Sequence, residues 1–375
     1  MPGTAPDFPA LRLIGWPYVG APDEGPWADM FALHPLARPM RVSEQHRSGY
    51  VVADRPDAAL RTESMAEWQR PRFPQHERPA VGDWVLVEGG TSTKARIVAL
   101  LPRRTSIKRG AAGDHYHQQV IAANVDTVFI VCGLDADFNP RRIERYLMLV
   151  GGGGAEPVVV LTKADQTDYA PEAVETLAEL AAQDITVLPV NAKDAASVAS
   201  LHDWLGAGRT AVLVGSSGAG KSTLTNTLLG IDRMKTAAVR ENDSRGRHTT
   251  THRALIPLPS GACLIDTPGM RELKPTGEED LAESGFSDVE AIAAQCKFRD
   301  CLHQREPGCA VRAAIESGDI DEERFMHYLK LRDEVAAAAD KLAVRVAEKA
   351  EAEKVAGKAQ QKSRQHRAEN KHRKF

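Results

Sequence analysis

The fold is decided by the stretch Val212-Leu-Val-Gly-Ser-Ser-Gly-Ala-Gly-Lys-Ser222, which matches the pattern G-x-x-x-x-G-K-[ST]. An apolar, strand-like run leads into it and a helix-like stretch, residues 223–229, follows it. The glycines let backbone N–H groups turn toward phosphate oxygens, and the helix adds its positive N-terminal end. This context favours a phosphate-binding loop over a chance glycine-rich turn. The predicted loop residues are Gly215, Ser216, Ser217, Gly218, Ala219, Gly220, Lys221, Ser222 and Thr223.

The chemistry of a nucleotide and its Mg²⁺ extends the prediction downstream. Lys221 would reach the β- and γ-phosphates, and the Ser222 hydroxyl would ligate Mg²⁺. A second element, Leu264-Ile-Asp-Thr-Pro-Gly269, closes another apolar run. There Asp266 can hold Mg²⁺ through water, and the backbone N–H of Gly269 can meet a γ-phosphate.

The segment Gly246-Arg-His-Thr-Thr-Thr251 lies between these two elements. A threonine in a loop at this place could complete the Mg²⁺ shell when a γ-phosphate is present. Thr250 and Thr251 are the preferred candidates, and spacing does not choose between them. The alternative is a polar surface loop.

Two further loops fit the reading of a guanine base. The first is Val158-Val-Val-Leu-Thr-Lys-Ala-Asp165, which resembles the N/T-K-x-D element of GTPases. Asp165 can accept two hydrogen bonds from guanine N1 and N2, which adenine cannot offer, and the Lys163 stem can lie over the base. Thr162 stands where Asn is usual, and a hydroxyl makes fewer hydrogen bonds than an amide. The second loop, Asn191, Ala192 and Lys193, follows another strand and would use a backbone N–H to read guanine O6.

The order of these elements is unusual. In Ras-like GTPases the phosphate loop comes first and the base-reading loops last, whereas here both base-reading loops precede residue 215. A sheet tolerates such a circular permutation when the old termini lie close together. One consequence is that the segments at residues 246–251 and 266–269 lead directly into the C-terminal part of the chain.

The regions that flank these motifs differ in composition and in hydrophobic periodicity. Residues 1–40 are rich in Pro, Gly and Ala, which predicts a poorly ordered arm or irregular extension. Short alternating runs over 41–112 predict a small antiparallel barrel or sandwich, with a long loop at 55–78. From residue 125 apolar runs alternate with helical segments, as in a parallel sheet covered by helices. A long helix is expected over roughly 321–355.

Five cysteines are an odd number, which argues against a disulfide framework. Cys132 and Cys263 sit in apolar runs and are expected to be buried thiols. The other three form C-x₄-C-x-H-x₅-C with one histidine, which predicts a closed tetrahedral, structural Zn²⁺ site rather than a set of free thiols. The predicted ligands are Cys296, Cys301, His303 and Cys309.

The formal net charge of −3 hides an asymmetry, because residues 358–375 carry seven Lys/Arg and one Glu. We interpret this tail as a disordered electrostatic tether for RNA, with a solubilising tail as the alternative. A basic stretch in the barrel region offers further RNA contacts, or is a solvated loop; its residues are Arg103, Arg104, Lys108 and Arg109. The chain shows neither a secretory signal nor an apolar run of about 18 residues, so we expect a cytoplasmic protein without membrane attachment.

Taken together, these motifs resemble the RsgA/YjeQ family of ribosome small subunit-dependent GTPases. The permuted order, Arg247-His-Thr-Thr-Thr251, Asp266-Thr-Pro-Gly269 and Gln295-Cys-Lys-Phe-Arg-Asp-Cys-Leu-His303 carry the resemblance over residues 41–335. It implies a multidomain chain: an N-terminal OB-fold β-barrel, a central circularly permuted α/β P-loop GTPase domain, and a mainly helical C-terminal zinc domain. The predicted divisions are 1–40, 41–115, 116–276, 277–345 and 346–375. The resemblance further implies late maturation of the 30S subunit, with subunit-stimulated hydrolysis of GTP promoting release, and we expect a monomer that contacts 16S rRNA.

Catalysis is expected to depend on a group other than the usual glutamine. Position 270 is Met, which cannot orient the attacking water as the Gln of Ras-like enzymes does. Our hypothesis is that His248 takes this role once the ribosome orders its loop; the alternative is that it contacts RNA. Two other functions stay open: a P-loop ATPase, and an RNA-binding module with a vestigial nucleotide site.

Overall fold

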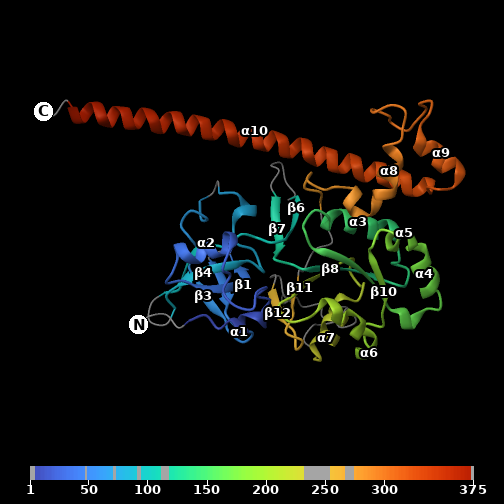
Figure 1. Cartoon of the computed structure of the whole chain (residues 1–375), viewed down its shortest axis with the longest axis horizontal. Coiled ribbons are helices and arrows are strands. Elements are labelled where there is room, and N and C mark those ends of the chain that lie inside the picture. Colours follow the sequence, from blue (N-terminus) through green and yellow to red (C-terminus); the bar gives the residue numbers. More distant parts are fainter. Residues whose placement is uncertain are drawn as a thin grey trace, which may run out of the picture.

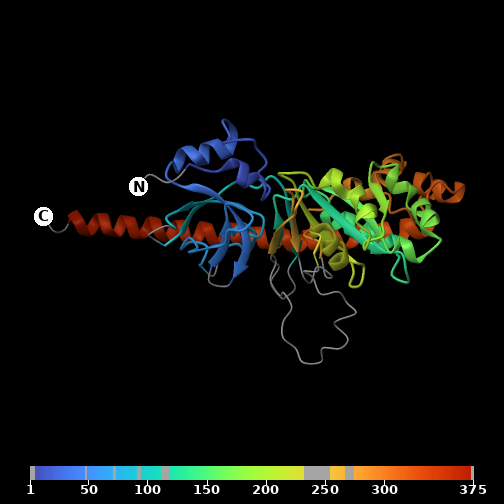
Figure 2. The same cartoon turned by 90° about the horizontal axis from the view of Figure 1, so that it is seen from below.

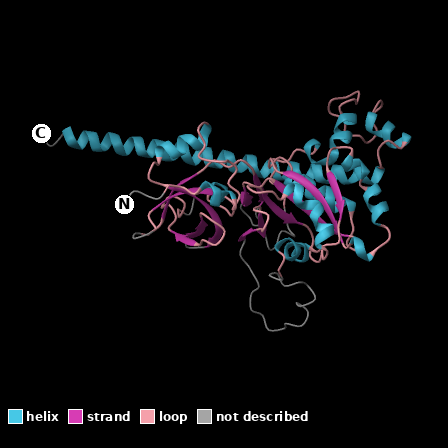
Figure 3. Ribbon diagram, turned by 60° about the horizontal axis from the view of Figure 1, so that its bottom comes forward, coloured by secondary structure: helices cyan, strands magenta, loops and turns pink. Residues whose placement is uncertain are grey.

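The computed structural model describes residues 5–46, 49–70, 73–90, 94–110, 118–231, 254–266 and 274–372, with backbone alone at 283–284, 349, 352–353 and 355–372. Within these residues eleven strands form one sheet, and the order along its main path is β10-β9-β8-β11-β13-β12-β1-β2-β3. Figure 3 shows the helices gathered around one half of this sheet, while the other half is mostly strand and loop.

The helix-covered half is the parallel sheet that the sequence predicts. Its strands are β8 (Thr127–Gly133), β9 (Glu156–Thr162), β10 (Thr186–Pro189), β11 (Thr210–Val214) and β13 (Cys263–Asp266), which pair in parallel. Its helical elements are α3 (Pro140–Val150), η2 (Ala164–Gln166), α4 (Ala170–Thr176), α5 (Ala178–Ala181), α6 (Ala195–Val198), η3 (Ala199–Trp204) and α7 (Lys221–Leu229). Alternate residues of β8 enter two different cores: Val128 and Ile130 pack in one, Phe129 and Val131 in the other. Both faces of the sheet are therefore buried, as in a doubly covered parallel sheet.

The other half is antiparallel and continues the same sheet. It comprises β1 (Arg38–His46), β2 (Gly49–Ala53), β3 (Leu60–Thr62), β4 (Trp84–Glu88) and β5 (Arg96–Leu100), beside a separate hairpin of β6 (Ser106–Gly110) and β7 (Gln118–Ala123). This agrees with the predicted barrel. The long loop expected at 55–78 instead contains β3 and a short 3₁₀ turn, η1 (Gln75–Glu77). β12 (Ala254–Pro257) pairs antiparallel with both β13 and β1, and so joins the two halves.

The N-terminal segment is packed, so the prediction of a poorly ordered arm is wrong for residues 5–40. It forms α1 (Phe8–Arg12) and α2 (Gly25–Leu33) on one side of the barrel strands (Figure 2). Trp16 and Trp27 are buried, and the Trp16 ring meets that of Trp84 edge to face at 4.7 Å between centroids. Two tryptophans provide enough apolar area to hold a short segment that otherwise lacks periodicity.

Arg41 fastens this segment to both halves of the sheet. Its guanidinium is fully buried and donates to the carbonyls of Ile14 (2.5 Å) and Asn124 (3.2 Å) and to Thr210 Oγ1 (2.8 Å). Gly15 lies so close that a Cβ there would stand 1.8 Å from Arg41 Nη1, which explains a glycine with φ of +88°.

The C-terminal part is helical. It comprises a π-helical turn, η6 (Ala282–Phe286), then α8 (Ser287–Ala293), α9 (Ala310–Ser317) and α10 (Glu322–His372). Figure 1 shows α10 as one rod that starts beside α8 and α9, passes β6 and β7, and ends beyond the barrel strands. The backbone of residues 358–372 is helical, so the prediction of a disordered tail is wrong there. Within the described part of the chain, no helix is long and apolar enough to cross a membrane.

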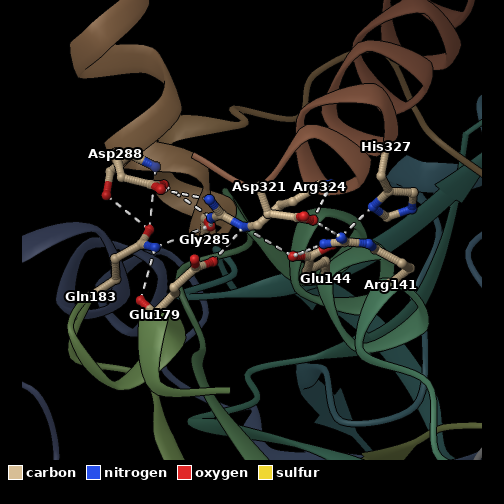
Figure 4. Close-up of polar contacts among 10 residues, drawn as sticks. Arg141, Glu144, Glu179, Gln183, Gly285, Asp288, Asp321, Arg324 and His327 are labelled. Atoms are coloured by element: carbon tan, nitrogen blue, oxygen red, sulfur yellow. Dashed lines mark hydrogen bonds and ion pairs between the residues drawn. The ribbon is translucent and has the colours of Figure 1, made fainter. Parts of the chain in front are cut away.

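A buried charge network joins α10 to the parallel half of the sheet (Figure 4). Arg324 on α10 and Glu144 on α3 are 3% and 5% exposed, and Arg324 Nε donates to Glu144 Oε1 at 3.1 Å. Arg324 also pairs with Asp288 of α8 (2.5 Å) and donates to the Gly285 carbonyl (2.8 Å). His327 Nδ1 lies 2.9 Å from the second Glu144 oxygen. The network fixes three helices against one another.

Removing the cation from this network should destabilise the junction strongly. Breaking a buried ion pair leaves an uncompensated charge and costs roughly 3–5 kcal/mol. We therefore expect Arg324→Met to lower the Tm by roughly 4–6 °C in a thermal melt. The control is Arg345→Met on the same helix, because Arg345 is 53% exposed and pairs only with Glu348 among the described side chains. Equal shifts for the two variants would contradict a stabilising role of the junction.

Candidate nucleotide and metal sites

The phosphate loop lies where the parallel strands end. Gly215 follows β11 with φ of +140°, and a Cβ there would stand 2.1 Å from the Val131 carbonyl oxygen of β8. Only glycine allows this close approach. Gly220 adopts φ of +93° immediately before α7. Lys221 Nζ donates back to the Gly215 carbonyl at 2.8 Å and to that of Ser216, so the side chain curls over the loop.

The predicted Mg²⁺ residues that the structure describes lie beside this loop. Asp266 is the last residue of β13, and its predecessor Ile265 is in register with Val212 of β11. Ser222 stands in the first turn of α7 and is half-buried. The predicted residues His248, Thr250, Thr251 and Gly269 lie outside the described residues.

Thr162 has a defined position in the first base-reading loop. It is fully buried at the end of β9, and its hydroxyl donates to the Ala219 carbonyl of the phosphate loop at 2.6 Å. The residue therefore links the two loops in place of an asparagine. Lys163 follows in a left-handed conformation (φ of +64°), which is uncommon for a side chain of this size. Asp165 lies exposed in η2, at the same edge of the sheet as Gly215.

The second base-reading loop, residues 191–193, is hydrogen-bonded to α7, the helix that follows the phosphate loop. Thr227 of α7 donates its hydroxyl to the Ala192 carbonyl at 2.6 Å. The Asn191 side chain accepts from the Lys193 N–H at 3.0 Å, and its backbone N–H donates to Ser197 Oγ at 2.9 Å. The structure thus brings together the phosphate loop, Asp266 and both base-reading loops on one edge of the sheet.

Sequence reasoning missed Asp135 and Asp137, which follow β8 at this edge. The Asp135 carboxylate pairs with Lys163, and that hydrogen bond holds the pKa of Asp135 below its usual value. The Asp137 carboxylate accepts from the Ser216 hydroxyl and from Arg142. Their place after a buried parallel strand was the available signal, because ligand-contacting loops follow the carboxyl ends of such strands.

The basic residues predicted to face RNA form ion pairs and hydrogen bonds with other residues of this chain. Arg103 grips the buried Asp83 through two nitrogens, at 2.9 and 2.7 Å. Lys108 pairs with Glu278 at 2.8 Å. Arg104 lies 3.6 Å from Asp126, and Arg109 hydrogen-bonds Gln119. These contacts favour a structural role over a free phosphate-binding face.

The cysteine cluster has the dimensions of a metal site. The ligand atoms of Cys296, Cys301, His303 and Cys309 all lie within 4.8 Å of one another. His303 Nδ1 is 3.5 Å from the sulfurs of Cys296 and Cys309, which are 3.9 Å apart. A tetrahedral zinc with bonds of about 2.3 Å to sulfur and 2.0–2.1 Å to nitrogen sets about 3.8 Å between sulfurs and about 3.5 Å between sulfur and nitrogen. The residues present therefore fit this ion.

Neighbouring groups hold the ligand loop in shape. His303 adopts φ of +60°, and its ring meets Phe325 of α10 edge to face. The Glu306 carboxylate accepts from the backbone N–H groups of Leu302 (3.0 Å) and Gln304 (2.8 Å), on either side of the histidine. The remaining cysteines, Cys132 and Cys263, are buried as predicted, and burial raises the pKa of Cys263 to about 11.

The fold and site define a circularly permuted P-loop GTPase. A family model described as RsgA GTPase matches residues 100–276. A protein of Xanthomonas axonopodis pv. citri, named small ribosomal subunit biogenesis GTPase RsgA, is 75% identical over 348 residues, 93% of this chain and 94% of the relative. The protein of that name from Xanthomonas oryzae pv. oryzae (strain PXO99A) is 74% identical over the same length. The chain belongs to the RsgA GTPase family, and it is a hydrolase of GTP.

Solved structures support the same architecture. YjeQ from Thermotoga maritima superposes with a TM-score of 0.59 at 25% identity, covering 80% of this chain and 99% of that one. YloQ, described as a circularly permuted GTPase, superposes with a TM-score of 0.56 at 22% identity, covering 81% and 96%. The predicted fold class is confirmed: a barrel side, a permuted GTPase domain, and a helical C-terminal part with a Cys₃His cluster.

Proposed function

We propose that this chain binds the 30S ribosomal subunit through its 16S rRNA and acts late in its maturation, hydrolysing GTP to GDP and phosphate as it leaves. The observation that supports this most is the continuous sheet, because β12 links the nucleotide edge directly to barrel strand β1. Nucleotide state can thereby reach an RNA-binding surface through one rigid element. The names of the relatives support the partner.

The nucleotide roles follow from position. Lys221 binds the β- and γ-phosphates and the backbone of residues 215–223 wraps them, while Lys163 and Asp165 select guanine with the backbone of 191–193. Ser222 and Asp266, with Thr250 or Thr251, would hold Mg²⁺, which neutralises charge on the phosphates when bound. Gly269 would offer its N–H to the γ-phosphate. An ATPase would have no use for Asp165, and a vestigial site would not keep Lys221, Ser222 and Asp266 together.

Hydrolysis requires a residue that orients the attacking water, and the side chain of Met270 cannot do so. We assign the role to His248, ordered by the docked subunit. His248→Ala should lower subunit-stimulated GTP turnover by about a hundredfold while leaving subunit binding intact. A variant that binds the subunit and keeps full stimulated turnover would contradict the assignment.

The C-terminal cluster would hold one structural zinc through Cys296, Cys301, His303 and Cys309, since all four positions belong to protein. We propose the division 1–40, 41–115, 116–276, 277–345 and 346–375, and a cytoplasmic monomer. The basic end of α10 would rest on RNA phosphates. Deleting residues 358–375 should weaken 30S binding and flatten its salt dependence; an unchanged affinity would contradict that contact.

Zinc binding is open to direct measurement. Elemental analysis of the purified protein should find about one zinc per chain, and Cys309→Ser should lose most of it. Cys132→Ala is the matched control, because Cys132 is buried in β8 and is not one of the four clustered ligands, so its loss should leave zinc content unchanged. Full zinc retention in Cys309→Ser would contradict the assigned ligand set.

The partner is tested by cosedimentation. The protein should pellet with 30S subunits in the presence of a non-hydrolysable GTP analogue, less with GDP, and not with 50S subunits. Equal pelleting with both subunits would overturn the proposed partner.

A further inference from the structure

A hollow of about 690 Å³ opens on the barrel between the start of β2, the segment after β3, the η1 turn and β7. This volume falls within the roughly 300–1,000 Å³ typical of small-ligand sites. The function proposed above uses no residue of it, and it lies on the half of the molecule away from the nucleotide edge.

Its wall is rich in side-chain amides. Gln45, Gln75 and Gln119 converge on it from β1, η1 and β7 together with Gln69, and none of its described lining residues is a carboxylate. Each amide carries both a donor and an acceptor. A wall of this kind complements the in-plane donor and acceptor edge of a nucleobase.

One guanidinium, that of Arg78, lines the hollow. Arg78 Nη2 donates to the carbonyls of Arg70 (3.0 Å) and Phe73 (3.1 Å), and among the described residues no carboxylate forms an ion pair with it. Four glutamates adjoin the lining residues along the chain, at positions 44, 63, 67 and 77. Of these, Glu44 pairs with His46 (2.9 Å), Glu63 with Lys94 (2.9 Å) and Glu77 with His76 (3.7 Å). None of these glutamates pairs with Arg78, so its guanidinium can meet an anion in the hollow.

Two largely buried aromatic residues also line the hollow. Tyr50 and Trp68 meet edge to face with 6.3 Å between centroids and are only 6% and 5% exposed. Burial raises the pKa of Tyr50 to about 12, so its hydroxyl stays neutral. Rigid aromatic surface, amides and one guanidinium are the groups that hold splayed bases of single-stranded RNA.

We propose that this hollow binds one unstacked nucleobase of single-stranded RNA, with the adjoining phosphate at Arg78. The inference rests on the proposed function, since it names the RNA feature that the barrel would recognise. A duplex cannot enter, because its bases are stacked and paired.

The test measures binding of short, fluorescein-labelled single-stranded RNAs to the full chain by anisotropy, using A-, C- and U-rich sequences. The variant is Gln75→Glu with Gln119→Glu, which keeps side-chain size and leaves Arg109 its acceptor at position 119. The matched control makes the same net charge change with two exposed arginines elsewhere, Arg55→Gln and Arg345→Gln, which are 63% and 53% exposed. Affinity for GDP serves as the folding control.

We expect the pocket variant to bind at least one of these RNAs about fivefold or more weakly, the charge control less than about twofold more weakly, and both to bind GDP normally. A matched RNA duplex should compete poorly. Equal losses in the two variants would overturn the inference, as would competition by a duplex or by an acidic peptide as strong as that by single-stranded RNA. GTP turnover of the wild-type protein with 30S subunits is measured separately. Stimulated turnover without RNA binding in the hollow would contradict this inference alone, whereas a lack of stimulation would contradict the proposed function.

Discussion

Replacing Lys221 by methionine is expected to lower kcat for GTP hydrolysis by at least about a hundredfold, the cost of removing one preorganised donor from developing charge. The structure gives the reason: Lys221 Nζ already lies over the loop, 2.8 Å from the Gly215 carbonyl, where phosphate oxygens would meet it. The measurement is phosphate release at saturating GTP.

The control for this experiment is Lys94→Met, because Lys94 is 85% exposed on the barrel and pairs only with Glu63 among the described residues. This variant should hydrolyse GTP at the wild-type rate. A Lys221→Met protein with kcat within a few-fold of wild type would show that the curled lysine is not the phosphate-binding group.

Replacing Asp165 by asparagine should change the base that the protein accepts. A site built to hydrogen-bond a donor pair rejects a mismatched base by large factors, so GTP affinity should fall at least about a hundredfold. Xanthosine triphosphate should gain affinity, because the asparagine amide donates to the xanthine C2 carbonyl. Titration with fluorescent nucleotide analogues measures both changes.

Asp168→Asn is the matched control, three residues along the same exposed loop, and should leave both affinities unchanged. Loss of GTP binding without any gain for the xanthine nucleotide would indicate disruption of the loop instead of base reading. Unchanged GTP affinity would remove Asp165 from the base site.

The parts of the site that the sequence predicted are those in which local geometry and chemistry coincide. The glycines of residues 215–220 occupy backbone conformations that other residues avoid, and the cysteine spacing permits few arrangements other than a metal site. The sequence predicts that Thr162 makes fewer hydrogen bonds in the base-reading loop than an asparagine would. In the structure its hydroxyl donates a hydrogen bond to the Ala219 carbonyl, a contact that motif spacing alone does not reveal.

What could not be predicted depends on partners distant in the chain. The sequence alone suggests that Arg103 is free to contact RNA. In the structure its guanidinium is hydrogen-bonded to Asp83, twenty residues away in the chain. The N-terminal segment lacks periodicity, and contacts with distant residues order it, such as the packing of Trp16 on Trp84 and the hydrogen bond from Arg41 to Ile14. The helical backbone at the end of α10 likewise continues from a packed first half, whereas its composition alone is typical of a solvated tail.

The most direct test of a subunit-dependent GTPase is the rate of GTP turnover by the wild-type protein, measured alone and with purified 30S or 50S subunits. Met270 and the absence of a glutamine at that position predict slow turnover alone. Turnover should rise by at least about a hundredfold with 30S subunits, and by little with 50S subunits. Equal rates with and without 30S subunits would contradict the proposed function.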